Sequence, residues 1–102
     1  MATHYVTLTW TAPADATSTE GYNVYRGTAQ GKEAATPIDA NPVCVGSAPG
    51  STCTWQDTNV VAGQTYWYYV EAVIGTSVFG PSNEATCTIP FAPVTNLTAV
   101  AS

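Results

Sequence analysis

The chain has 102 residues, of which 45% are hydrophobic, and this suits one compact domain with one core. Two basic side chains stand against seven acidic ones, for a net charge of −5 at pH 7, which excludes a basic surface for nucleic acid or anionic lipid. No apolar run approaches the roughly 20 residues that cross a bilayer. The abundance of Thr, Val, Ala, Tyr, Gly and Pro favours strands separated by turns, and hence an all-β fold.

The first predicted strand covers residues 4–10. Val6, Leu8 and Trp10 alternate with threonines there, so we expect these three side chains on one buried face. A second strand is predicted over residues 21–27, bracketed by glycines, with Tyr22 and Val24 pointing inward.

Residues 28–51 are irregular, because the three prolines at positions 37, 42 and 49 would each break a central strand. The chain has an odd number of cysteines, Cys44, Cys53 and Cys87, without the spacing of a zinc site. Cys44 and Cys53 flank a turn-rich segment and are a possible disulfide. The alternative is three reduced, buried thiols. A disulfide would indicate an oxidising, extracellular setting.

An extended pattern resumes at residues 53–55 and is strongest at residues 66–73. Tyr66, Tyr68 and Val70 share one face of that run, and Trp67 and Tyr69 share the other. Residues 75–81 are predicted as a turn, after which residues 82–89 form the second strand of a hairpin.

In their order and spacing these segments resemble a fibronectin type III domain of the kind repeated in secreted bacterial and archaeal proteins. The matching segments are residues 6–10 for strand B, 21–26 for C, 62–66 leading into F, and 80–85 opening G. The resemblance implies an antiparallel two-sheet, immunoglobulin-like sandwich over residues 1–90, with Tyr66 as the corner tyrosine. It also implies an extracellular or cell-surface location, for which a leader would have to lie outside this sequence.

The chain departs from this family at its C-terminal end, where residues 91–102 look like a linker followed by strand A. To fill its own domain in the usual direction, this segment would first run back about 25 Å. The connector, residues 90–93, spans at most about 14 Å. We therefore expect donation to a neighbouring molecule beside the acceptor edge at Val6 and Leu8. The predicted assembly residues are Val94, Asn96, Leu97 and Ala99.

Strand donation of this kind is head to tail, so it would build a homo-oligomeric filament or, if the rotation closes, a ring. The alternative is that the segment belongs to the next repeat of a tandem array. Asn96 also begins an N-glycosylation sequon with Leu97 and Thr98.

The sequence offers no evident catalytic device. His4 is the single histidine, it lies beside the N-terminus, and it has no obvious nucleophile or carboxylate partner. The acidic residues are scattered and no glycine-rich phosphate loop follows a strand. We therefore expect a non-enzyme with no catalytic residues, no metal site and no cofactor.

A competing hypothesis is ligand binding. Tyr25, Trp67 and Tyr69 are predicted on one outward face of two neighbouring strands, where they would stack on a polysaccharide or pack against another surface protein. The chain would then be an accessory module of a secreted enzyme or adhesin. Simple cross-strand stabilisation explains the same pattern.

Overall fold

A computed structural model describes residues 4–91 and 97–101 of the chain. The described residues form strands and no helix. The strands are β1 (Val6–Thr11), β2 (Gly21–Gly27), β3 (Thr52–Asp57), β4 (Thr65–Ile74), β5 (Ser77–Phe79) and β6 (Ala85–Thr88).

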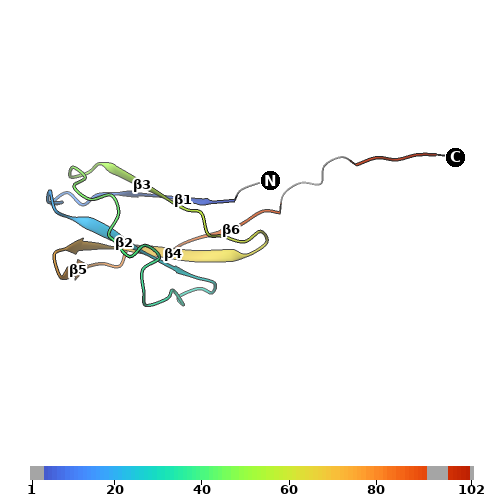
Figure 1. Cartoon of the computed structure of the whole chain (residues 1–102). Helices are drawn as coiled ribbons and strands as arrows, with labels where there is room; N and C mark the ends of the chain where they lie inside the picture. The colour runs from blue at the N-terminus through green and yellow to red at the C-terminus, as the bar shows by residue number, and fades with distance from the viewer. Residues whose placement is uncertain (1–3, 92–96, 102) are drawn as a thin grey trace.

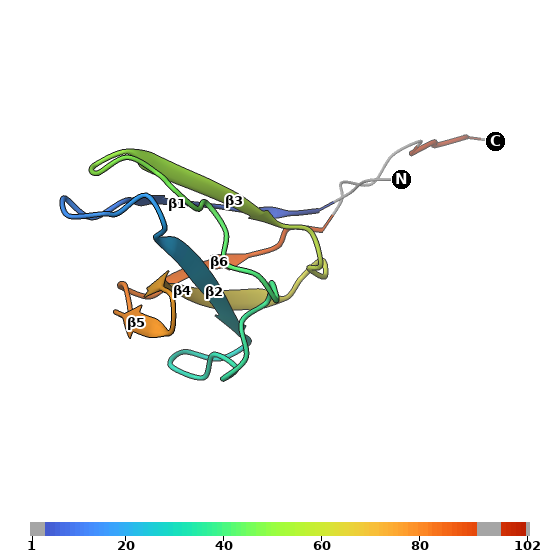
Figure 2. The ribbon, with the colours of Figure 1, turned by 60° about the vertical axis from the view of Figure 1, so that its left-hand side comes forward.

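The strands form two antiparallel sheets that face each other (Figures 1 and 2). One sheet pairs β1 with β3. In the other, β2 pairs with one edge of β4, and β5 and β6 pair in succession along the other edge. The expectation of an all-β protein with two antiparallel sheets is therefore confirmed, and the protein is a β-sandwich.

The core lies between the sheets and comes from alternate positions of their strands. Its buried members are Val6, Val24, Tyr66, Tyr68 and Ile89. Tyr22 and Val24 are buried, as predicted. Period-two alternation thus assigns β1 its inner face and the first half of β4 its own, because successive side chains of a strand point to opposite sides.

The predicted turn over residues 75–81 is wrong. The chain reverses within Gly75 and Thr76, and Ser77–Phe79 already pair with Ala72–Ile74 as β5. Gly75 adopts a φ of 60°, which glycine reaches without steric cost. All three residues of β5 are exposed, so the sequence there shows no alternation between buried and exposed positions.

The irregular segment between β2 and β3 closes one side of the sandwich. The N–H groups of Ala34 and Ile38 donate to the carbonyls of Arg26 and Val24, at 3.0 and 2.8 Å, so this segment runs beside the free edge of β2. Further along, Val43 and Tyr22 exchange two backbone hydrogen bonds.

Candidate functional site

The opposite side of the sandwich, along β1, is open. The Ala12 N–H donates to the Ser51 carbonyl at 2.8 Å, which continues the register of β1 on β3. Because hydrogen-bonding direction alternates along a strand, Thr7, Thr9 and Thr11 turn their N–H and C=O groups away from β3. Among the described residues, no strand pairs with this outer edge.

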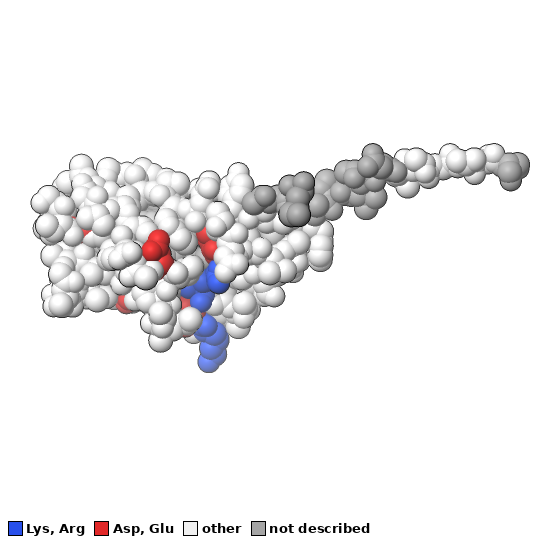
Figure 3. All heavy atoms as spheres, viewed as in Figure 1, with Lys and Arg blue, Asp and Glu red and all other residues white. Residues whose placement is uncertain are grey.

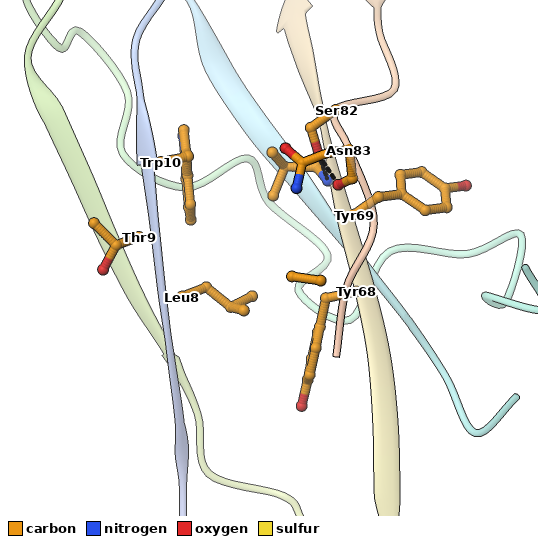
Figure 4. Close-up of a pocket in the computed structure, with 9 residues that line it drawn as sticks. Leu8, Thr9, Trp10, Tyr68, Tyr69, Ser82 and Asn83 are labelled. Carbon is orange, nitrogen blue, oxygen red and sulfur yellow. Dashed lines mark hydrogen bonds between the residues drawn. The ribbon is translucent and has the colours of Figure 1, made fainter. Parts of the chain in front are cut away.

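An apolar groove lies beneath this edge, between β1 and the chain that joins β5 to β6. Figure 4 shows Leu8 extending from β1 toward Tyr68 on β4, with the Trp10 ring beside β1. The section beside Leu8 holds about 80 Å³, and the section from Trp10 to Pro13 holds about 600 Å³. No residue that lines either section is charged.

The far wall of the groove is held on β4 by Ser82. The Ser82 N–H donates to the Val70 carbonyl at 2.9 Å, and the Val70 N–H donates to the Ser82 hydroxyl at 3.0 Å. Both walls are therefore attached to paired strands, and the groove has a defined shape.

Two side chains show that the core is incomplete at this edge. Leu8 and Trp10 pack against the core but stay half-buried, whereas Val6 on the same face is buried. The Trp10 indole Nε1 is buried and has no hydrogen-bond partner among the described residues. A buried donor without a partner costs about 1–3 kcal/mol. The groove is thus the weak point of the sandwich.

Residues 97–101 of the C-terminal segment do not fill this groove in their own molecule. Leu97 and Val100 are 87% and 93% exposed, and residues 97–101 belong to no strand. Figure 1 shows these residues away from the two sheets. Ala99 is likewise exposed, and the two other predicted assembly residues, Val94 and Asn96, lie outside the described residues.

The end of the sandwich from which this segment departs is firmly held. The Gly63 N–H donates to the Ile89 carbonyl at 2.7 Å, and the Ile89 N–H donates to the Gln64 carbonyl at 2.9 Å. Ile89 itself is buried. In both ribbon views β1 begins and β6 ends at this same pole (Figures 1 and 2).

The two cysteines singled out in the sequence, Cys44 and Cys53, are joined in a disulfide, with Cα atoms 6.0 Å apart. This bond ties the segment after β2 to β3 and so helps to close the side opposite the groove. Cys87 on β6 is a free, half-buried thiol. The Tyr66 hydroxyl accepts a hydrogen bond from the Val61 N–H at 3.0 Å, five residues upstream.

The expected outward aromatic face needs correction. Tyr25 is buried, with 8% of its surface exposed, and it stacks on Tyr69 with ring centroids 4.8 Å apart. Trp67 and Tyr69 are half-buried. With Tyr25 buried and the other two rings half-buried, the three rings do not form an open platform.

A buried polar cluster that the sequence analysis missed crosses between the sheets. Asp57 on β3 is 2% exposed and accepts hydrogen bonds from Arg26 on β2 at 2.7 Å and Tyr68 on β4 at 2.8 Å. The Arg26 guanidinium also lies over the Tyr66 ring, 5.4 Å from its centroid. Asp57 thus receives hydrogen bonds from two strands of the facing sheet, which fits a structural tie between the sheets.

The described residues contain no group of three His, Cys, Asp or Glu side chains that could hold a metal ion. No helix among them is long and apolar enough to cross a membrane. Figure 3 shows a face with few charged side chains.

Tyr22 lines the wide section of the groove, and its raised pKa predicts that the protein loses stability at alkaline pH. Burial and then its hydrogen bond to Glu20 raise the pKa of Tyr22 from 10.0 to about 12. Because the folded pKa exceeds the unfolded one, the neutral phenol stabilises fully below pH 10, and this contribution is lost as the pH rises from 10 to 12. We expect the urea midpoint to fall across that window, and to fall less in Tyr22→Phe. An equal fall in both proteins would contradict this assignment.

No family model matches the sequence, and no curated protein matches it.

Proposed function

We propose that the chain is a non-catalytic extracellular structural module of fibronectin type III character that assembles head to tail by strand donation. In this proposal the C-terminal segment of one molecule fills the open edge of β1 in the next. The observation that carries the proposal is an apolar groove, under a strand edge of β1 with which no described strand pairs, in a chain whose own Leu97 is 87% exposed.

The groove and the C-terminal segment, residues 91–102, match in their lack of charge, and this supports their pairing. Residues 91–102 contain no charged side chain, and none lines the two groove sections. Insertion of an extended strand would give hydrogen-bond partners to Thr7, Thr9 and Thr11 and would cover Leu8 and Trp10. An open, apolar strand edge is otherwise a site of uncontrolled aggregation, which proteins normally cover.

The direction in which the C-terminal segment would run along β1 favours its insertion into another molecule. Since β1 begins where β6 ends, a segment folding back on its own molecule would run parallel to β1 (Figures 1 and 2). The four residues 90–93 reach at most about 14 Å, which leaves no room to start from the opposite pole. A neighbour that approaches from that pole has no such restriction. The disulfide between Cys44 and Cys53 supports the extracellular setting.

Light scattering tests the proposal by comparing the full chain with a truncation that ends at Ile89. We expect the full chain to form a ladder of oligomers whose mean mass grows with concentration, and the truncated chain to stay monomeric. Ile89 is retained because it belongs to the core. Monomers in both samples, at concentrations up to the millimolar range, would overturn the proposal and favour a spacer within a tandem array.

A further inference from the structure

We infer that the donated strand runs antiparallel to β1 in one register, with Leu97 opposite Trp10 and Ala99 opposite Leu8 of the next copy. This inference rests on the proposed function and adds the orientation and the contacts that select a second copy of the chain. Three features of groove and tail support it, and the taper of the groove is the one that selects the direction of the strand.

The first feature is the alternation of the tail. Leu97, Ala99 and Ala101 share one parity and are all apolar, whereas the other parity holds Thr98, which is polar, and Val100. Side chains that face each other across two paired strands point to the same side of the sheet. We therefore place Leu97, Ala99 and Ala101 opposite the inward residues of β1, on the inner side of the donated strand.

The second feature is the taper of the groove. It holds about 600 Å³ near Trp10 and Pro13 but about 80 Å³ near Leu8. In an antiparallel strand, Leu97 lies beside Trp10 at the wide section, and Ala99 follows beside Leu8 in the narrow one. A parallel strand that spans the same part of β1 reverses this order, with leucine in the narrow section and alanine in the wide one.

The third feature is the hydrogen-bonding edge. With Leu97 opposite Trp10, Thr98 lies opposite Thr9, and Val100 lies opposite Thr7. Thr9 and Thr7 turn their N–H and C=O groups to the open edge, so each of these pairs exchanges two backbone bonds. Their side chains point outward, and both threonines are exposed. This register thus pairs the backbone groups at the open edge and, at the same time, places apolar side chains in the groove.

Cysteine cross-linking between two single-site variants tests the register, in a Cys87→Ala background that removes the free thiol. A full chain carrying Val100→Cys is mixed under mild oxidation with full chains carrying Thr7→Cys, Thr9→Cys or Thr11→Cys. We expect the Thr7→Cys partner to give several-fold more covalent dimer than the other two. With Thr98→Cys as the donor, the preferred partner should become Thr9→Cys.

The outcomes separate register from assembly. If Val100→Cys instead prefers Thr11→Cys while Thr98→Cys keeps Thr9→Cys, the strand is parallel and the inference is wrong. Equal yields at all three threonines, with oligomers still seen by light scattering under reducing conditions, would also overturn it while leaving assembly intact. If neither cross-links nor oligomers are observed, the proposed function itself is wrong.

Discussion

Replacing Asp57 with alanine should lower the free energy of unfolding by about 3–5 kcal/mol, the cost of breaking a buried ion pair by removing one partner. Asp57 accepts hydrogen bonds from Arg26 at 2.7 Å, from Tyr68 at 2.8 Å and from the Asn59 N–H at 3.1 Å. Its loss leaves the guanidinium and the phenol without their shared acceptor. Burial and the Asp57 contact also raise the pKa of Tyr68, so the neutral phenol remains as a buried donor. Urea unfolding at pH 7 measures the effect.

Two variants bracket this result. Tyr68→Phe removes one donor and keeps the ion pair, so we expect a loss of about 1–3 kcal/mol. Asp15→Ala changes an exposed carboxylate and should stay within about 0.5 kcal/mol of the parent. If Asp57→Ala unfolded at the same urea concentration as Asp15→Ala, the cluster would contribute nothing to the tie between the sheets.

The alternation of apolar and polar residues within short segments was sufficient to predict most of the strands. Val6, Leu8 and Trp10, and Tyr66 with Tyr68, repeat every second residue, and this periodicity follows directly from strand geometry. β5 was missed because its three residues are all exposed and carry no such repeat. It forms through pairing with β4 across a two-residue turn.

The burial of Tyr25 and the Asp57 cluster could not be predicted in the same way. Period-two alternation tells which side of a sheet a residue occupies, but it does not tell whether another segment covers that side. Tyr25 was therefore expected on an open face, and the structure buries it. The cluster joins residues from three strands that are up to 42 positions apart in the chain, from Arg26 to Tyr68, so no local pattern contains it.

Only one part of the groove along β1, its open strand edge, could be predicted from the sequence. A displaced strand-like segment predicts that an edge is open near Val6 and Leu8, and the structure describes β1 with no partner strand on that edge. The taper of the groove and the unpaired Trp10 Nε1 depend on how the two sheets are spaced. These features are properties of packing, and they are what makes a definite register arguable.

Replacing Leu97 with aspartate should abolish most of the assembly while leaving the folded subunit intact. Burial of a leucine side chain stabilises by about 2 kcal/mol, and its loss alone raises the dissociation constant at least about thirtyfold. An unpaired carboxylate in a groove lined by uncharged residues adds a further desolvation cost. Because Leu97 is 87% exposed in the single molecule, the urea midpoint of the dilute subunit should not move.

Val100→Asp is the matched control, because Val100 is also exposed and lies in the same segment but has the opposite parity. It adds the same charge on the outer side of the donated strand, so we expect oligomers in light scattering at a dissociation constant within a few fold of the parent. Equal loss of assembly in both variants would show that added charge, not insertion of Leu97, weakens the contact. Loss in Val100→Asp with assembly preserved in Leu97→Asp would mean that the strand inserts with its other face. Only selective loss at Leu97 fits a donated strand whose leucine completes the core of the next molecule.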